Sequence, residues 1–449
     1  MTGLIQAVES AFSAHGMLAR KLEGFRLRPG QQAMAHAVAK VIDDGGVLAV
    51  EAGTGVGKTL AYLVPALLSG EKVIISTATK TLQEQLFLRD LPRLAQALGF
   101  PVRMALLKGR GSYVCTQRLS IAHQAAYDFS AQDLDLLEAA RNWVHSTVEG
   151  DIAELGVLQD HVALAGLVTS TRDNCLGASC PQIGNCHTLQ ARKRALQAEL
   201  VVVNHHLFFA DAQVRTSGVA ELLPSVHTVV FDEAHQLSDI GVQFLGRRWT
   251  TGQAQSLAQA LAAHNSGPAR GLTDWLGLAA DLVQAAKALQ ELVFTTGHEP
   301  RRAWTEAVPE AIAPDAWEAG TGTLLRILAQ ALEVSRSLEP AWPQVGVVAQ
   351  RCQDMYDSLL AFAQARPADQ LRWLECGNGL GLHQAPLTIA AHMRAMLQGP
   401  DGVTAQTGKS WIFTSATLGT DPQLSWFADQ CGLEGHTVLQ LPSPCKHDY

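Results

Sequence analysis

A glycine-rich octapeptide near the start of the chain has a composition suited to binding phosphate. It reads Ala52-Gly53-Thr54-Gly55-Val56-Gly57-Lys58-Thr59. An apolar run precedes it and an apolar helical segment follows it, so backbone N–H groups and a helix start can face phosphate oxygens. We expect Lys58 to contact the β- and γ-phosphates of a nucleotide and Thr59 to hold Mg²⁺. Ala52 replaces the first glycine of the strict pattern. A turn that only caps a helix is the simpler alternative, which this combination of features disfavours.

Two adjacent carboxylates follow another apolar run. Asp232 and Glu233 come directly after the run at 228–231 and precede Ala234 and His235. The first carboxylate can hold Mg²⁺ through water, and the second can orient or deprotonate an attacking water. This division of roles suits hydrolysis of a phosphoanhydride. A solvated acidic pair is the common alternative, and its occurrence together with the octapeptide disfavours it.

Four of the eight cysteines lie between these two motifs. They are Cys115, Cys175, Cys180 and Cys186. Four thiolates can hold a [4Fe–4S] cluster or a tetrahedral zinc ion. The C-x4-C-x5-C spacing of the last three lacks the short paired knuckles of most zinc sites. The remaining cysteines are scattered and are interpreted as ordinary buried or surface thiols.

Short apolar runs alternate with helical segments around these motifs. The runs lie at 47–50, 73–76, 102–107, 200–203, 228–231 and 411–413. This alternation predicts an α/β domain with a parallel sheet covered by helices on both faces. Two stretches interrupt it. Residues 111–190 hold the clustered cysteines, and residues 246–370 have helical periodicity, which predicts a small bundle.

Composition places few limits on function. The chain has 449 residues and 47% hydrophobic residues, which argues against disorder. A net charge of −8 neither indicates nor excludes nucleic-acid binding, because a motor needs only a local basic lining. No apolar stretch is long enough to span a membrane, and the N-terminus lacks the features of a signal peptide. We therefore expect a cytoplasmic protein.

The order of these motifs resembles that of superfamily 2 DNA helicases of the DinG/XPD type, most closely the bacterial DinG and YoaA branch. Two further elements carry the resemblance, Phe25–Gln31 and Ser76–Leu86, together with the five residues Thr414-Ser415-Ala416-Thr417-Leu418. The resemblance implies a RecA-like P-loop domain that binds ATP and Mg²⁺. In it Gln31 would bond the adenine edge with support from Arg28, and the Thr77–Thr81 region would contact a DNA strand.

The resemblance also implies how the chain is divided. The expected segments are 1–110, 191–245 and 371–420 for the first helicase domain, 111–190 for an iron–sulfur domain, 246–370 for a helical arch, and 421–449 for the start of a second helicase domain. The family also has an arginine finger in its second domain, and residues 420–449 contain no arginine. We therefore expect the sequence to be truncated.

The function that the resemblance implies is that of an ATP-dependent 5′→3′ DNA helicase. Such a protein translocates on single-stranded DNA and unwinds forked or tailed duplexes in DNA repair or replication-stress recovery. We expect a monomer with one [4Fe–4S] cluster, in which the cluster domain and arch form a gate for one strand. The alternative is an ATP-binding, DNA-binding module without motor activity, which would carry the same motifs.

Several other residues near the cysteines and the acidic pair have no assigned chemistry. His187 could replace a cysteine as a metal ligand, although a free surface histidine is the more ordinary interpretation. Arg192, Lys193 and Arg194 could face a DNA backbone or form a solvated helix end. His205 and His206 are adjacent, which makes joint binding of one metal difficult, so we expect a structural role.

Overall fold

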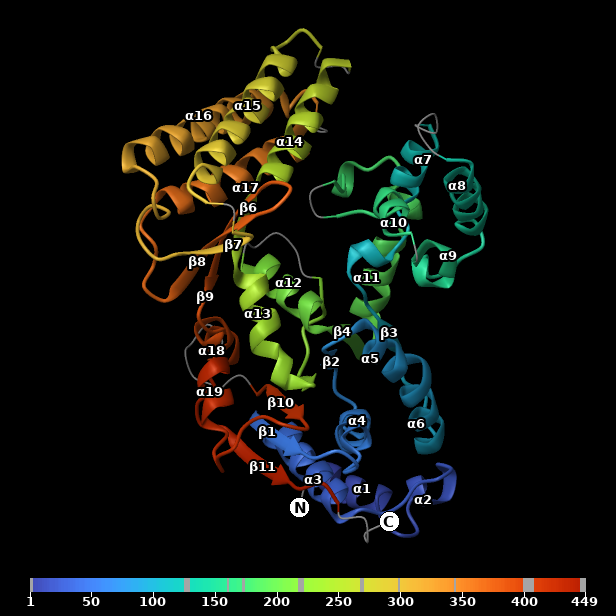
Figure 1. The fold of residues 1–449 in the computed structure, drawn as a ribbon. Helices are drawn as coiled ribbons and strands as arrows, with labels where there is room; N and C mark the ends of the chain where they lie inside the picture. Colours follow the sequence, from blue (N-terminus) through green and yellow to red (C-terminus); the bar gives the residue numbers. More distant parts are fainter. Residues whose placement is uncertain are drawn as a thin grey trace. The chain divides into compact units, whose positions relative to one another are not determined.

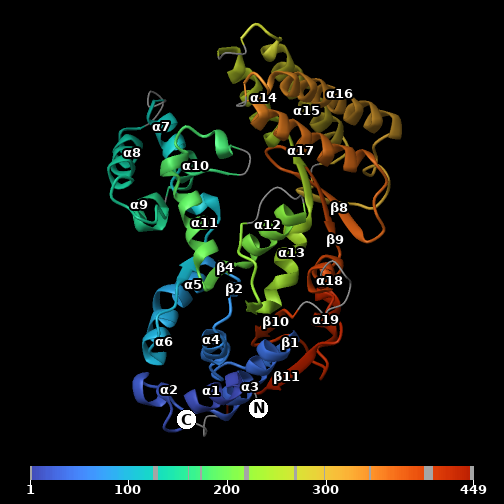
Figure 2. The ribbon, with the colours of Figure 1, turned by 180° about the vertical axis from the view of Figure 1, so that it is seen from behind.

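The computed structural model describes residues 3–124, 130–159, 161–171, 174–216, 222–266, 270–297, 299–342, 345–398 and 408–444. The chain forms two compact units (Figures 1 and 2). The first unit comprises Met1–Thr169, Asn185–Phe244 and Thr388–Tyr449, and the second comprises Ser170–Gly184 and Leu245–Leu387. Among the described residues, no helix combines the length and apolar character needed to cross a membrane.

A seven-stranded sheet forms the centre of the first unit, with strand order β11-β1-β10-β5-β2-β4-β3. All neighbouring strands pair in parallel, which confirms the predicted α/β class. The strands are β1 (Gly46–Ala52), β2 (Val73–Thr77), β3 (Met104–Leu106), β4 (Leu200–Asn204), β5 (Thr228–Asp232), β10 (Ser410–Ser415) and β11 (Thr437–Leu441). Their apolar runs are almost continuous because both faces of the sheet are covered.

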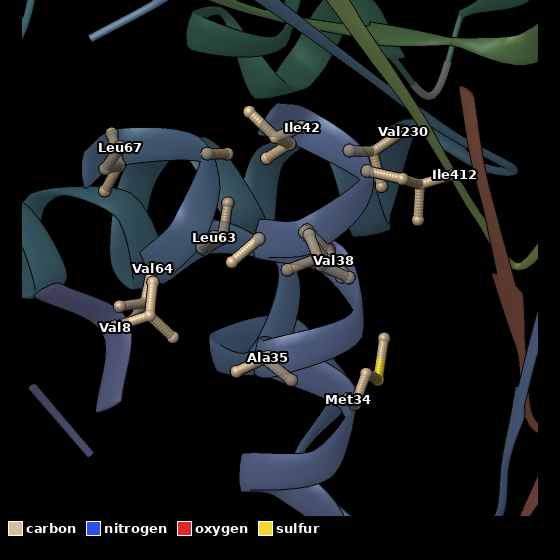
Figure 3. Close-up of a cluster of buried hydrophobic side chains, with 14 of the residues drawn as sticks. Val8, Met34, Ala35, Val38, Ile42, Leu63, Val64, Leu67, Val230 and Ile412 are labelled. Carbon is tan, nitrogen blue, oxygen red and sulfur yellow. The ribbon is translucent and has the colours of Figure 1, made fainter. Parts of the chain in front are cut away.

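Helices α1 (Gly3–Ala11), α3 (Pro29–Asp44) and α4 (Lys58–Leu68) share one core with the sheet. Figure 3 shows side chains of α3 and α4 gathered near Val230 and Ile412 of the strands. The next residues along these strands, Phe231 and Phe413, point to the opposite face, as the alternation of a strand requires.

Aromatic packing covers that opposite face. Phe208 of α12 (His205–Thr216) lies 4.8 Å from Phe231, and Phe427 of α19 (Ser425–Cys431) lies 5.9 Å from Phe413, measured between ring centroids. The other helices around this sheet are α2 (Met17–Lys21), α5 (Lys80–Gln85), α6 (Leu91–Leu98), α11 (His187–Gln197), α13 (Leu237–Leu245) and α18 (Ala390–Gln398).

Helices with their own small core follow β3. They are α7 (Thr116–Gln124), α8 (Ala131–Trp143), α9 (Gly156–Gln159) and α10 (Val162–Val168). Two isolated β-bridges connect the start of this segment to its middle, Tyr113 to Asp151, and to its end, Val114 to Thr169. Most of the expected iron–sulfur segment therefore belongs to the first compact unit.

The second unit contains the predicted helices and a sheet that we did not expect there. The helices are α14 (Thr251–Ala263), α15 (Trp275–Phe294), α16 (Pro314–Leu338) and α17 (Val345–Ala363). The antiparallel sheet has the order β6-β9-β8-β7 and consists of β6 (Arg247–Thr250), β7 (Arg301–Trp304), β8 (Gln370–Cys376) and β9 (Leu380–Pro386). One core joins these helices and strands.

Two of the expected domain boundaries need correction. We placed residues from 371 onward in the helicase domain, but β8 and β9 complete the sheet of the second unit, which extends to Leu387. We also expected 421–449 to begin a second helicase domain. Instead, β11 pairs with β1 in the seven-stranded sheet, from Leu48 opposite Thr437 to Ala52 opposite Leu441.

Candidate nucleotide-binding site

The glycine-rich loop joins the end of β1 to the start of α4, as predicted. Gly55 and Gly57 have φ angles of 89° and 90°, a left-handed conformation that glycine adopts at little cost. Gly53 is crowded instead: a Cβ atom there would lie 2.3 Å from Oγ of Ser443. The loop conformation thus depends on the absence of side chains at these positions.

Strand order brings Lys58 and Glu233 together. β10 lies between β1 and β5, so the loops after these three parallel strands meet at one edge of the sheet. Nζ of Lys58 lies 3.9 Å from Oε1 of Glu233 and 3.5 Å from the carbonyl oxygen of Ala52. A lysine suited to phosphate and a carboxylate suited to activating water therefore face each other beside the loop.

Asp232 occupies the more enclosed position of the acidic pair. Burial, followed by the neighbouring Glu233 carboxylate, raises the pKa of Asp232 to about 6. The Tyr62 hydroxyl, from α4, donates a 3.2 Å hydrogen bond to Oδ2 of Asp232. Burial and the carboxylate also raise the pKa of Tyr62 well above its usual value, so it remains a donor. A bound divalent cation would relieve the repulsion between the two carboxylates.

Glu233 connects the nucleotide edge to the segment after β10. Its φ angle is 56°, an unusual conformation for a residue with a side chain. Oε2 of Glu233 lies 3.3 Å from Nδ1 of His235 and accepts a 3.4 Å hydrogen bond from Ser415. Nδ1 of His235 is also 2.8 Å from Oγ of Ser415. These three side chains form one polar network across β5 and β10.

Tyr62 and Glu51 are site residues that sequence reasoning missed. Oε2 of Glu51, at the end of β1, accepts hydrogen bonds from the backbone N–H groups of Leu418 and Gly419, at 2.6 Å and 3.0 Å. For Glu51, the available signal in the sequence was a single charged residue between the apolar run at 47–50 and Ala52. Glu51 thereby fixes the turn after β10 against the strand that leads into the phosphate loop.

A cavity of about 250 Å³ adjoins Thr59. Arg28 and Gln31, both predicted, line it, as do Phe25, Asp90 and Arg93, among others. Nε2 of Gln31 donates a 2.9 Å hydrogen bond to the carbonyl oxygen of Gly57. Its Oε1 is buried and has no hydrogen-bond partner among the described residues. Gln31 therefore lies beside both the cavity and the candidate phosphate loop.

Comparison with known proteins identifies the family. The family description "DEAD/DEAH box helicase" matches residues 28–124. The ATP-dependent DNA helicase YoaA of Haemophilus influenzae is 37% identical over 98% of this chain and 67% of its own length. The chain belongs to the YoaA/DinG family of DEAD/DEAH-box helicases.

Other relatives agree with this placement. YoaA of Escherichia coli is also 37% identical, over 96% of this chain and 66% of its own length, so the chain spans about two thirds of these relatives. The helicase DinG of Mycobacterium tuberculosis is 38% identical over 47% of this chain and 34% of its own length. A solved XPD helicase shares the fold, with a TM-score of 0.50 and 15% identity over 93% of this chain and 62% of that one.

The element that resembles the family's strand-contacting motif uses some of its hydroxyls internally. Thr77 is buried and donates a 3.2 Å hydrogen bond to the carbonyl oxygen of Thr79. Oγ1 of Thr79 caps α5 by accepting from the N–H of Leu82 at 3.2 Å. Lys80 and Thr81, on the same turn, are exposed. The exposed pair is therefore better placed for a phosphate than Thr77.

His205, the first residue of α12, is fully buried. Its Nδ1 lies 2.7 Å from Oγ of Ser76, at the end of β2. Burial lowers the pKa of His205 to about 3, so the ring is neutral. His206 is exposed, so the two rings occupy different environments. This geometry supports the structural role that we predicted for the pair.

The four candidate cluster cysteines do not all belong to one unit. Each is half-exposed and none forms a disulfide. The N–H of Cys115 donates to the carbonyl oxygen of Val168 at 2.8 Å, whereas Cys175 and Cys180 belong to the part of the chain assigned to the second unit. Among the described residues, no three His, Cys, Asp or Glu side chains form a metal-binding group. The donor chemistry fits an iron–sulfur cluster, which stays a prediction.

The structure corrects the expected position of His187 and favours one of the two roles considered for Arg194. His187 is buried rather than on the surface, and its ring lies against Gly150, where a Cβ would be 2.2 Å from Cγ of His187. Arg194 forms an ion pair with Glu149. That pair favours a local structural role for Arg194 over contact with DNA.

Proposed function

We propose that this chain is the nucleotide-binding motor part of an ATP-dependent DNA helicase. The observation that carries the proposal is the placement of Lys58 opposite Glu233, with Asp232 held by Tyr62. These groups have the charges that phosphoanhydride hydrolysis needs, on loops that follow β1 and β5, the two strands on either side of β10. Membership of the YoaA/DinG family supports the choice of ATP and DNA.

Each residue has a proposed role in hydrolysis. The backbone of residues 53–57 and Lys58 bind the phosphates, and Glu233 accepts the proton of the water that attacks the γ-phosphorus as the bond to the bridging oxygen breaks. Thr59 and Asp232 would hold Mg²⁺, which supplies positive charge to the phosphates when it is bound. Gln31, supported by Arg28, accepts from the adenine amino group through the unsatisfied Oε1.

The action on DNA is a further part of the proposal. We propose translocation in the 5′→3′ direction on single-stranded DNA, with forked or tailed duplexes as substrates, in DNA repair or the replication-stress response. We also propose that Cys115, Cys175, Cys180 and Cys186 hold a [4Fe–4S] cluster that stabilises residues 111–190. The active species would be a cytoplasmic monomer.

The test compares Lys58→Ala with Glu233→Gln. Lys58→Ala should weaken ATP binding, because a cation at the phosphates is lost. Glu233→Gln should bind ATP normally and hydrolyse it about 10²–10⁴-fold more slowly, because only proton transfer is removed. Fluorescent-nucleotide binding and steady-state hydrolysis with single-stranded DNA measure both quantities. The exposed Glu71→Gln is the matched control.

The outcomes separate the motor from a simple binding module. If Glu233→Gln hydrolyses ATP at the wild-type rate, the site assignment is wrong. ATP-dependent displacement of a strand from a 5′-tailed duplex would support the motor. Binding of ATP and DNA by the wild-type protein with no hydrolysis would instead favour a nucleotide-controlled binding module.

A further inference from the structure

The sheet of the second unit has one face packed on its core and one face that is partly open. On the packed face, Arg372 and Arg302 make hydrogen bonds and ring contacts within the unit. Nε of Arg372 donates to Gln384, and its guanidinium lies 4.9 Å from the ring of Trp304. Arg302 donates hydrogen bonds to Thr296 and to the carbonyl oxygen of Val293. These two side chains are therefore committed to internal contacts.

The open face carries a different set of side chains. Arg248 of β6 lies opposite His383 of β9, which lies opposite Trp373 of β8. The rings of Trp373 and His383 are stacked, with centroids 5.1 Å apart and planes at 12°. The guanidinium of Arg301, from β7, lies 4.7 Å from the Trp373 centroid. A layered stack of two rings and one guanidinium thus crosses the sheet whose strands are labelled in Figure 1.

A cavity of about 620 Å³ lies beside this stack. Arg248, Arg301 and His383 line it, together with Gly381 and the turn between β8 and β9. A Cβ atom at Gly381 would be 2.7 Å from Nε2 of His383, so glycine leaves the space that the ring occupies. The cavity is therefore lined by two arginine side chains and by the His383 ring, the end of the stack that continues to Trp373.

The charge of this site is positive. Neither Arg248 nor Arg301 forms an ion pair in the part of the chain that the structure describes. The nearby acid, Glu375, is already engaged: it accepts a 3.1 Å hydrogen bond from Nε1 of Trp373 and lies 3.2 Å from Nε2 of His383. The two exposed guanidinium groups thus line the cavity without an ion-pair partner among the described residues. The one carboxylate nearby, that of Glu375, contacts Trp373 and His383 instead.

We propose that this face binds single-stranded DNA, as a contact additional to the first unit, and the inference rests on the proposed helicase function. Phosphates bind the guanidinium groups of Arg248 and Arg301, and a base stacks on the Arg301–Trp373 layer. A guanidinium can stack through its plane while its edge donates to phosphate. Cationic grooves that also present aromatic rings are typical of single-strand binding, because unpaired bases expose their faces. A duplex hides those faces.

The experiment measures the affinity of the 449-residue protein for fluorescein-labelled oligo-dT by anisotropy, without nucleotide. Arg248→Gln and Arg301→Gln should each weaken binding and lower the slope of log affinity against log salt by about 1. Trp373→Ala should weaken binding by about 5- to 100-fold through lost stacking. Arg301→Lys keeps the charge without the planar stack and should give an intermediate affinity.

The control is Arg326→Ala, an exposed arginine on α16 of the same unit, which should bind like the wild type. Wild-type affinity in both glutamine variants would overturn the proposal, as would equal competition by duplex DNA. ATP affinity, measured on every variant, separates this result from the proposed function. Absence of ATP binding by the wild-type protein would refute the proposed nucleotide site, whereas wild-type oligo-dT binding by these variants with normal ATP affinity would refute only this DNA surface.

Discussion

At the scale of single residues, the site combines ordinary side chains with unusual surroundings. Asp232 has a raised pKa because it is enclosed and next to Glu233. Gln31 has one amide atom bonded to the phosphate loop, and the other is buried with no partner in the described part of the chain. Buried polar atoms without partners are costly, so a ligand that satisfies them gains affinity. The cavity beside Gln31 is where we expect that gain.

Gln31→Ala should reduce both ATP affinity and the preference for ATP over GTP. Loss of one hydrogen bond to the base should cost about 1–2 kcal/mol of ATP binding, while GTP binding should change little. Competition of the two nucleotides against a fluorescent analogue measures the ratio. Gln32→Ala is a suitable control, because Gln32 donates instead to the carbonyl oxygen of Phe12. An unchanged ratio in Gln31→Ala would remove this residue from base recognition.

Thiol reactivity should distinguish the proposed cluster ligands from the other cysteines. Burial raises the pKa of Cys352 and of Cys431 to about 12, so both remain protonated and unreactive at pH 8. The four proposed ligands are half-exposed. Iodoacetamide should label those four in metal-free protein and spare them in protein purified without air. Peptide mapping by mass spectrometry, with iron and zinc analysis, provides the readout.

The cluster prediction has two clear ways to fail. Stoichiometric zinc without iron would make the site a zinc centre. Equal labelling of the four cysteines before and after metal removal would show that they hold no metal. Cys175→Ser should lower the iron content to near zero while ATP binding persists, since the nucleotide site uses other parts of the chain.

At the scale of elements, the parallel strands are held by buried side-chain hydrogen bonds as well as by the backbone hydrogen bonds between paired strands. The hydrogen bond between His205 and Ser76 joins the start of α12 to the end of β2. Ser410 of β10 donates a 2.7 Å hydrogen bond to the carbonyl oxygen of Val41, at the end of α3. Such bonds hold strand ends in the arrangement on which the site depends.

His205 should make the stability of the sheet depend on pH. Its pKa is about 3 in the folded protein and about 6.5 when unfolded, so between these values only the unfolded chain binds the proton. Its contribution is therefore fully present above about pH 6.5 and is lost at up to about 1.4 kcal/mol per pH unit as pH falls. Comparison of wild type with His205→Asn isolates this effect from that of Asp232, which titrates in both proteins.

Hydrogen exchange of amides in β2 and β4, between pH 6.5 and 4.5, is a local measure of this stability. His205→Asn should show a weaker loss of opening free energy on acidification than the wild type. His206→Asn, at the adjacent exposed position, should keep most of the wild-type dependence. Identical pH profiles for wild type and His205→Asn would contradict the buried neutral histidine.

At the scale of the whole molecule, the two units have separate hydrophobic cores. The nucleotide site is built wholly from the first unit, and the proposed DNA surface wholly from the second. A core change in one unit should therefore leave the local chemistry of the other intact. This separation allows binding of ATP and of single-stranded DNA to be examined by different variants.

Leu282→Ala should destabilise the second unit by about 2–5 kcal/mol, because Leu282 is fully buried in its core. ATP affinity at a temperature where the protein remains folded should not change. Leu276→Ala makes the same chemical change on the same helix at a position 53% exposed, and should cost no more than about 0.5 kcal/mol. Thermal unfolding and nucleotide binding test both statements. Loss of ATP binding in folded Leu282→Ala would show that the units are not independent.

The sequence by itself determined the parts of the site that depend on neighbours in the chain. Glycines at 53, 55 and 57 with Lys58 and Thr59 specify a phosphate loop, and the apolar runs specify strands buried on both faces. Because the carboxyl ends of parallel strands meet at one edge, the sequence alone is enough to assign Asp232 and Glu233 to the same site.

The distant residues that complete the site become evident from the three-dimensional fold. The contacts of Tyr62 with Asp232 and of Glu51 with Leu418 depend on strand order, with β10 between β1 and β5. Local periodicity reports which face of a strand is buried, but not which strand lies next to it. For the same reason the sequence analysis placed β11 in a second helicase domain. It also did not predict the antiparallel sheet whose open face carries Arg248. Strand neighbours are selected by long-range packing, which no short window of sequence contains.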